Sequence, residues 1–139
     1  MTDQQPSTNI PGVIAYLQLS DAKAAAELYK KAFAAKEIDR KPTPDGRLIH
    51  CHLEINNGAL MLADFFPEYG QEQQPVQGVV LHIASSLPRV WWDRALGAGL
   101  EVVVPLEVAF WGDLYGRLRD PFGVLWGFVG PANAAGKAA

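Results

Sequence analysis

The sequence is short of several features that define large classes of protein. It has one cysteine, Cys51, so the chain cannot form an internal disulfide, which is compatible with a reducing compartment. No apolar run approaches the roughly 18 residues that a membrane helix needs. Residues 1–9 are polar and lack the basic and then apolar layout of a signal peptide, so we expect a cytoplasmic protein.

Positive charge is also scarce. The chain carries 12 Lys and Arg against 15 Asp and Glu, a formal net charge of −3, and no basic cluster. This balance argues against nucleic acid as a partner, just as the lack of apolar runs argues against a membrane. The 139 residues suffice for one globular domain that buries about two thirds of its extended surface.

Apolar periodicity predicts a first set of elements. Alternation predicts strands over residues 12–19, 48–55 and 59–65, with a short strand over residues 37–40. Helical spacing predicts a helix of about four turns after Ser20, which we expect to be the N-cap. The apolar stripe of this helix is Ala25, Leu28, Tyr29, Ala32 and Phe33. Pro44-Asp45-Gly46 and Asn56-Asn57-Gly58 predict turns, because Asn and Gly tolerate positive φ.

The same order of elements returns after residues 67–77, a Gln-rich segment with the composition of a surface linker. We expect a strand over residues 78–84, then a helix over residues 88–96 capped by Ser86. Its inward residues are predicted to be Val90, Trp91 and Ala95. A short strand over residues 101–104, ended by Pro105, precedes a final hairpin. An offset of about 65 residues superimposes the two halves, which indicates duplication of one unit.

The hairpin lies in the segment that reads Phe-Trp-Gly-Asp-Leu-Tyr-Gly-Arg-Leu-Arg-Asp-Pro-Phe-Gly-Val-Leu-Trp, residues 110–126. Asp120-Pro121-Phe122-Gly123 predicts a type I turn, with Pro fixing φ at its second position. The pattern FWGDxYGxxxDPFGxxW resembles the closing segment of the vicinal-oxygen-chelate superfamily, which includes glyoxalase I, bleomycin-resistance proteins and extradiol dioxygenases. The wording is most similar to its PhnB-like branch, and the resemblance covers nearly all of residues 11–129.

The resemblance implies an α+β fold of two tandem βαβββ modules, whose curved mixed sheets carry helices on the outer face and a concave pocket on the inner face. The modules are expected at residues 11–66 and 78–130 of a single domain, joined by the linker 67–77. Residues 1–10 and 131–139 are expected to form a flexible arm and a flexible tail.

Strand alternation assigns side chains to the two faces. Two apolar sets should pack under the helices: Val13, Ala15, Leu17 and Leu19, and Ile49, Cys51, Leu53 and Ile55. The opposite face should carry the ligand-binding groups, a mixture of polar and aromatic side chains typical of small-molecule sites. These are Tyr16, Gln18, His50, His52, His82, Tyr115 and Arg117, together with Phe110 and Trp111 of the loop before the last hairpin. Glu54 and Arg119 share this face.

The metal centre implied by the resemblance is expected to be absent. In metal-dependent members of the superfamily, His, Gln or Glu ligands come from the first and last strand of each half. The matching positions are Ile14, Leu62 (Met61 if the register shifts by one residue), Val80 and Gly127, where the ending DPxGxxxE has lost its Glu. Apolar side chains offer a cation no donor. A rearranged site built from His50, His52 and His82 is the alternative.

Other candidates have structural alternatives. His82 or Glu54 are the weak candidates for a catalytic base, although a pocket histidine more often hydrogen-bonds a neighbour. Cys51 is expected to be an inert core thiol. Asp64 and Asp113 are expected to cap turns or hold Arg117. Arg47, Arg117 and Arg119 can grip an anionic ligand or pair with Glu54 or Asp113.

The aromatic residues are the stronger indication of function. Trp91 and Trp126 are expected in the core, whereas Phe110 and Trp111 are expected either to fill the core as well or to stack on a flat ligand. The sequence therefore predicts a homodimeric, metal-free protein that binds a small flat or amphipathic molecule and needs no cofactor. The alternative is a metal-dependent lyase, isomerase or dioxygenase. A methyltransferase label, which some PhnB-like relatives carry, has no support, because no Gly-rich loop joins a strand to a helix.

Overall fold

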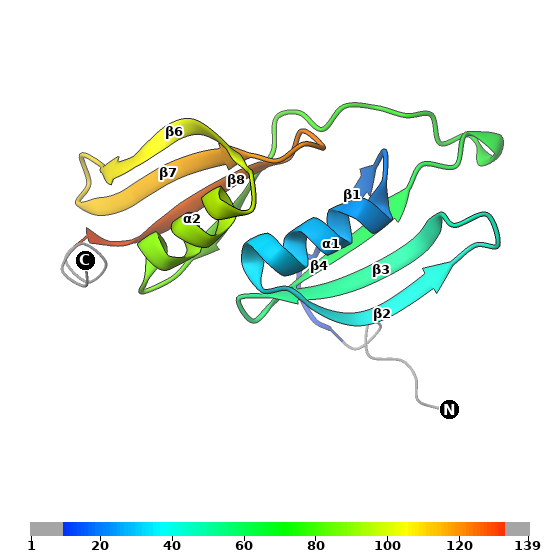
Figure 1. The fold of residues 1–139 in the computed structure, drawn as a ribbon, viewed down its shortest axis with the longest axis horizontal. Helices are drawn as coiled ribbons and strands as arrows, with labels where there is room; N and C mark the ends of the chain where they lie inside the picture. Colours follow the sequence, from blue (N-terminus) through cyan, green and yellow to red (C-terminus); the bar gives the residue numbers. More distant parts are fainter. Residues whose placement is uncertain (1–9, 133–139) are drawn as a thin grey trace.

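A computed structural model describes residues 10–132 (Figure 1). The expected arm and tail lie almost wholly outside these residues. The first half contains β1 (Ala15–Leu19), α1 (Ala22–Phe33), β2 (Lys36–Pro42), β3 (Leu48–Ile55) and β4 (Gly58–Asp64). A single turn of 3₁₀ helix, η2 (Pro67–Tyr69), begins the linker. The second half contains β5 (Val80–Ala84), α2 (Pro88–Gly97), β6 (Glu101–Val108), β7 (Asp113–Arg119) and β8 (Leu125–Pro131).

Each half forms its own four-stranded mixed sheet, in the orders β1-β4-β3-β2 and β5-β8-β7-β6. The first strand of each half runs parallel to the last, and the other pairs are antiparallel. Leu17 pairs with Leu62 in the first sheet and Ile83 pairs with Phe128 in the second. These pairs are related by 66 residues. The predicted α+β fold of two βαβββ modules is therefore confirmed.

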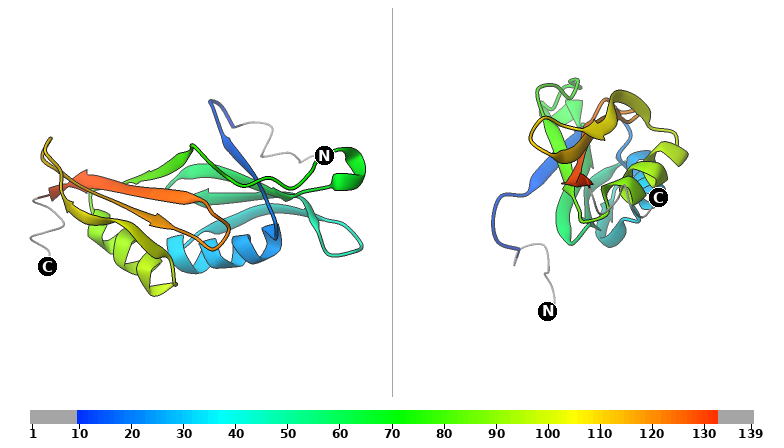
Figure 2. Two further views of the ribbon diagram at one scale, coloured as in Figure 1. Left: turned by 90° about the horizontal axis from the view of Figure 1, so that it is seen from above. Right: turned by 90° about the vertical axis from the view of Figure 1, so that its left-hand side faces the viewer.

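Both helices lie on the same side of the sheets and contact each other, so the modules share one core (Figure 2). The aromatic part of this core crosses the boundary between modules, because the Phe33 ring of α1 lies 4.4 Å from the Trp126 ring of β8, centroid to centroid. Trp92 of α2 meets Phe128 at 5.5 Å, edge to face. Trp126 is buried, as predicted.

The final hairpin turn is as expected and also joins the modules. The Gly123 amide donates to the Asp120 carbonyl at 3.1 Å and closes the predicted turn. The buried Asp120 carboxylate accepts the amides of Phe122 and Val124 at 2.9 and 3.0 Å. It also accepts the Trp126 indole N–H at 3.0 Å and the hydroxyl of Tyr29 from the other module. One carboxylate thus fixes a turn and the packing of α1 on the second sheet.

Helix starts differ from the sequence prediction. Asp21 rather than Ser20 caps α1, its carboxylate accepting the Ala24 amide at 3.0 Å. Ser86 does not cap α2; the Ser85 hydroxyl accepts the Leu87 amide instead, and Pro88 begins the helix. A carboxylate caps a helix as well as a hydroxyl does. The sequence alone therefore could not show which of two adjacent capping residues begins each helix.

Several predicted faces are also wrong. Val13 precedes β1 and is fully exposed. An irregularity in the β2–β3 register near the start of β3 leaves Ile49 exposed and buries Leu48 instead. On α2, Trp92 is buried, whereas Val90 is 48% exposed and Trp91 is only partly buried. Leu28 of α1 is likewise only partly buried.

Two strands run further than the sequence indicated. Strand β6 continues through Pro105 to Val108, because an edge strand tolerates a residue without an amide hydrogen. Strand β8 extends to Pro131, beyond the expected module boundary at residue 130.

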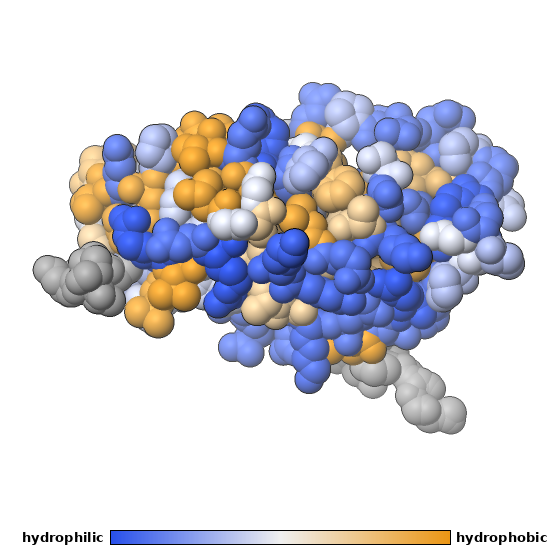
Figure 3. Space-filling view, viewed as in Figure 1, coloured by the Kyte–Doolittle hydropathy of each residue, from blue (hydrophilic) through white to orange (hydrophobic). Residues whose placement is uncertain are grey.

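The second module also shows more apolar surface than the first in the view of Figure 3. No helix within residues 10–132 is long and apolar enough to cross a membrane.

Candidate functional site

The face of each sheet opposite the helices, called here the open face, carries most of the predicted ligand-binding residues. In the first module, Tyr16 pairs with Met61, which pairs with His52. Residues paired in this way point to the same side of a sheet. The buried residues Leu17, Leu62 and Cys51 form the neighbouring row and pack under the helices.

The first open face holds Tyr16, Gln18, His50 and His52. The rings of Tyr16 and His50 lie 6.0 Å apart, and the Tyr16 hydroxyl donates to the Ile49 carbonyl at 3.2 Å. Burial lowers the pKa of His50, so its imidazole is neutral near pH 7. His52 is only 4% exposed, and its Nδ1 has no hydrogen-bond partner among the described residues. Gln18 donates to the Gln71 side chain of the linker at 3.0 Å.

The second open face holds a connected group, called here the His82 cluster, that consists of His82, Phe110, Trp111, Tyr115 and Arg117. The Tyr115 hydroxyl lies 3.1 Å from His82 Nε2 and accepts a hydrogen bond from Arg117 Nε at 2.7 Å. The ring centroids of Trp111 and Tyr115 lie 5.8 Å apart, and those of Phe110 and Trp111 5.0 Å apart. Trp111 is 52% exposed and Phe110 98% exposed, so their faces are available to a ligand.

The nine predicted ligand-binding residues therefore form two groups, one in each module. A cavity of about 280 Å³ at the seam between the modules is lined by His82 together with Ala15, Asn56 and Trp126 among others. Asn56 also donates across this seam to the Ala84 carbonyl at 2.8 Å. The other members of the His82 cluster do not line this cavity.

The metal positions of the resemblance offer no donor set. Leu62 lies on the helix face, so the residue of β4 that matches a metal position on the open face is Met61. Met61 and Gly127 are 66 residues apart in the sequence. Ile14 and Val80, the matching positions at the start of each module, have the same separation. A Cβ built on Gly127 would lie 2.8 Å from His82 Nε2 and 3.2 Å from the Tyr115 hydroxyl. The space that a metal-binding Glu would need is filled by His82. Within residues 10–132, no three His, Cys, Asp or Glu side chains gather closely enough to hold an ion.

The remaining candidates have structural roles or none. Cys51 is buried, and burial raises the pKa of its thiol, as suits an inert core residue. The buried Asp64 carboxylate accepts the Ala22 amide at 3.0 Å and the Leu48 amide at 2.6 Å, so it ties the start of α1 to β3. Arg47 forms ion pairs with Asp45 and Glu68 rather than with Glu54 or Asp113.

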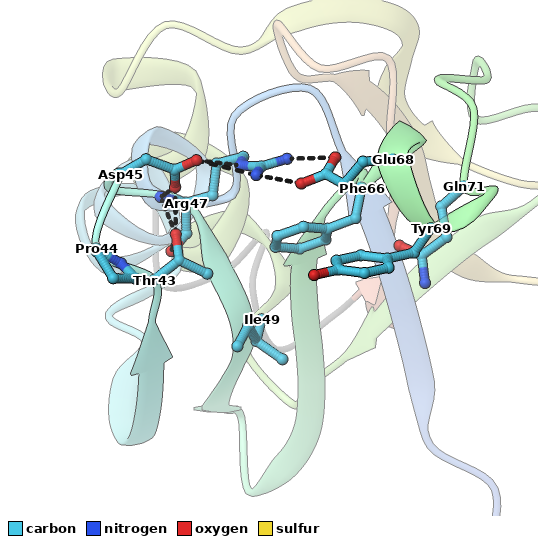
Figure 4. A pocket seen from close by; sticks show the side chains of 9 residues that line it. All are labelled: Thr43, Pro44, Asp45, Arg47, Ile49, Phe66, Glu68, Tyr69 and Gln71. Atoms are coloured by element: carbon cyan, nitrogen blue, oxygen red, sulfur yellow. Dashed lines mark hydrogen bonds and ion pairs between the residues drawn. The ribbon is translucent and has the colours of Figure 1, made fainter.

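Sequence reasoning missed a cavity of about 530 Å³ in the first module (Figure 4). This cavity, called here the rim pocket, lies between the β2–β3 turn and η2. Its lining is Thr43, Pro44, Asp45, Arg47, Ile49, Phe66, Glu68, Tyr69 and Gln71. The aromatic residues Phe66 and Tyr69 could have indicated a ligand site in the sequence. The alternation of residues along a strand, however, does not predict that these two rings lie next to Ile49.

Comparison with known proteins gives the family. Residues 12–128 match the Glyoxalase/Bleomycin resistance protein/Dioxygenase superfamily. The uncharacterized protein Mb0911c of Mycobacterium bovis is 39% identical over 129 residues, which cover 88% of this chain and 85% of that protein.

Solved structures agree in fold. TioX from Micromonospora sp. ML1 superimposes with a TM-score of 0.70 at 21% identity, covering 86% of this chain and 98% of TioX. A glyoxalase-related enzyme from Fulvimarina pelagi gives a TM-score of 0.68 at 18% identity, covering 86% of each chain. At these identities the likeness concerns the fold alone. The match over residues 12–128 shows that the chain belongs to the Glyoxalase/Bleomycin resistance protein/Dioxygenase superfamily.

Proposed function

We propose that this protein binds a small flat or amphipathic molecule on its open faces without the superfamily's usual metal. The observation that carries the proposal is the position of His82. Its ring covers Gly127, the residue that replaces the family's last metal ligand, and hydrogen-bonds Tyr115. A metal-binding Glu and the His82–Tyr115 pair cannot occupy this place together.

The His82 cluster provides the ligand-binding surface in this proposal. Tyr115 is held by two polar neighbours, Arg117 and His82, so its ring is oriented before a ligand arrives. Trp111 and Phe110 add exposed ring faces at the edge of the cluster. Aromatic pairs contribute about 0.5–1.5 kcal/mol beyond their buried area, enough to favour flat ligands. Arg117 also supplies a guanidinium for an anionic or carbonyl substituent.

We propose further that the protein acts as a cytoplasmic homodimer in which a second copy covers these faces. Tyr16 is 51% exposed on the first open face, and Trp111 is 52% exposed in the loop beside the second. A two-fold axis would place the first open face of one copy opposite the His82 cluster of the other and complete a ring-lined cavity. We also propose that the protein belongs to the PhnB-like branch of the superfamily, a proposal that only the wording of the closing segment, residues 110–126, supports.

A metal-dependent lyase, isomerase or dioxygenase is the alternative, and no specific contact favours it. His50 and His52 lie on the first sheet and His82 on the second, where its Nε2 already meets Tyr115. Catalysis by His82 or Glu54 as a base would need a substrate held against one of them. We therefore propose ligand binding without a cofactor.

The experiment joins a metal analysis to a thermal-shift screen. The protein is purified without a metal column, its metal content measured, and its melting temperature recorded with flat heterocycles, antibiotics and thiol adducts. We expect much less than one metal per chain and stabilisation by at least one flat compound, which follows RT ln(1 + [L]/Kd). Trp111→Ala should weaken that compound's binding about tenfold, since one ring contact is lost.

Two controls decide the outcome. Trp91→Ala removes an indole of the same size from α2, outside the cluster, and should leave the affinity within about twofold once the protein's folding is verified. A stoichiometric divalent ion, with loss of ligand stabilisation on adding a chelator, would overturn the metal-free proposal. Equal weakening by the two tryptophan variants would overturn the assignment of the surface.

A further inference from the structure

We propose that the rim pocket is a second ligand site, one that takes a flat aromatic cation. The pocket belongs to the first module and shares no residue with the His82 cluster, so this inference does not depend on the proposed function. Its walls come from the turn before β3 and from η2 at the start of the linker (Figure 4).

The pocket has the volume and the apolar surface of a small-molecule site. About 530 Å³ lies within the range of ligand cavities. Ile49 lies between the two walls in Figure 4, and Pro44 belongs to the turn on one side. On the other side the rings of Phe66 and Tyr69 lie 6.5 Å apart, centroid to centroid. A flat ring system that enters this space would meet apolar groups on several sides.

The two aromatic rings differ in availability. The Arg47 guanidinium lies 4.3 Å from the centroid of Phe66 and covers that ring. Tyr69 is 79% exposed, so its ring is the free surface on which a ligand can stack. A positive charge over such a ring is attracted by its quadrupole, by about 0.5–1 kcal/mol at an exposed site.

Charge decides which ligand fits. The lining holds two carboxylates, Asp45 and Glu68, and one guanidinium, Arg47, which leaves one net negative charge. Hydrogen bonds from Thr43 and Arg47 lower the pKa of Asp45 to about 2. The hydrogen bond from Arg47 also lowers the pKa of Glu68, so both acids are ionised at neutral pH. The pocket therefore attracts a cation and repels an anion.

Arg47 is fully engaged and does not serve as an anion receptor. Its two terminal nitrogens donate to both oxygens of Glu68, at 3.1 and 2.6 Å, in the bidentate geometry of strong ion pairs. Its Nε donates to Asp45 at 3.1 Å. This network runs from the turn to η2 in Figure 4 and holds the two walls together. Each Glu68 oxygen accepts one of these hydrogen bonds and keeps a lone pair for the amino group of a ligand.

Neighbouring contacts keep the pocket formed before a ligand binds. The Thr43 amide and hydroxyl and the Arg47 amide close the turn. Gln71 is held by Gln18 of β1 at 3.0 Å. A site that is already organised loses less ordering free energy on binding.

Fluorescence anisotropy with rhodamine 6G, a flat aromatic cation, tests the proposal against fluorescein, a flat aromatic anion. We expect the cation to bind at least about tenfold more tightly than the anion at low salt. Tyr69→Ala should weaken rhodamine 6G about fivefold by removing the free ring, and Glu68→Gln about threefold by removing one charge.

Matched variants separate this site from its surroundings. Glu72→Gln makes the same charge change beside the pocket but outside its lining, and Trp91→Ala removes a ring of α2 that belongs neither to this lining nor to the His82 cluster. Both should leave rhodamine 6G binding within about twofold. Equal binding of the two dyes, or equal effects of Glu68→Gln and Glu72→Gln, would refute the pocket's charge selection. Loss of binding in Trp111→Ala with none in Tyr69→Ala would assign the dye to the cluster instead.

Discussion

At the scale of single residues, the carboxylates of two buried aspartates connect segments that are distant in the sequence. Asp64 and Asp120 are both buried, and each accepts backbone amides from segments that would otherwise end with unpaired donors. Asp120 does more, because the Tyr29 hydroxyl and the Trp126 indole also donate to it. Removing either donor leaves part of a buried carboxylate without a partner, which is costly.

Tyr29→Phe tests this arrangement through pH. Burial and the neighbouring Asp120 charge raise the pKa of Tyr29 well above its usual 10.0. The unfolded chain therefore releases this proton first, and the stability that the phenol contributes is complete below pH 10 and falls above it. We expect the variant to be less stable by about 1 kcal/mol at pH 7 and the difference to shrink toward pH 10.5.

Urea unfolding of both proteins at several pH values measures that difference. Tyr69→Phe serves as the control, because the Tyr69 side chain is largely exposed and its hydroxyl makes no hydrogen bond among the described residues. A gap between wild type and Tyr29→Phe that stayed constant up to pH 10.5 would contradict the raised pKa.

At the scale of elements, the close approach of β8 to the start of α2 depends on a glycine. A Cβ on Gly130 would overlap the Ser85 carbonyl oxygen and lie 2.8 Å from Pro88 Cδ. In the first module the equivalent position is Asp64, which reaches the start of α1 with its side chain. The two copies of the unit thus join strand to helix differently, by a carboxylate in one and by direct backbone contact in the other.

Gly130→Ala should therefore lower stability by about 1–3 kcal/mol, because backbone atoms must move to make room. Gly97→Ala is the matched control. Gly97 ends α2, and a Cβ added there would meet no neighbouring element within 4 Å, so the variant should be neutral or more stable by up to about 1 kcal/mol. Chemical denaturation of the two variants measures both values. Equal stability of the two would show that α2 does not press on β8 as described.

At the scale of the whole molecule, we expect the modules to unfold as one cooperative unit, because their cores are continuous. Phe33 meets Trp126 and Phe128 across the boundary, and Asn56 donates to Ala84 at the seam. The linker, by contrast, runs over the surface with residues 70–75 exposed.

We expect a chain cut at a protease site inserted between Gln73 and Gln74 to stay folded, with both fragments eluting together. Phe33→Ala in the cut chain should release them, since the loss of a buried aromatic ring costs about 3–5 kcal/mol. Size-exclusion chromatography before and after cleavage measures this. Separation of the fragments in the otherwise unchanged protein would contradict a shared core.

Local patterns in the sequence predicted much of the fold. Alternation assigned Leu17, Cys51 and Leu53 to the core, and the Asp120–Gly123 turn followed from Pro and Gly chemistry. The β2–β3 irregularity at Ile49 and the inward turn of Trp92 could not be predicted, because both depend on which neighbour each strand or helix packs against. A shift by one residue reverses the face of a strand residue.

For the site, the sequence alone determined which side-chain donors are missing, since the side chains of Ile14, Val80 and Gly127 offer a cation no nitrogen, oxygen or sulfur atom. Tertiary structure decided what stands there instead. It brought His82 from β5 over Gly127 of β8 and set both beside Tyr115 of β7. It also assembled the rim pocket from two segments, residues 43–49 and 66–71, whose meeting depends on the path of the chain rather than on local preference.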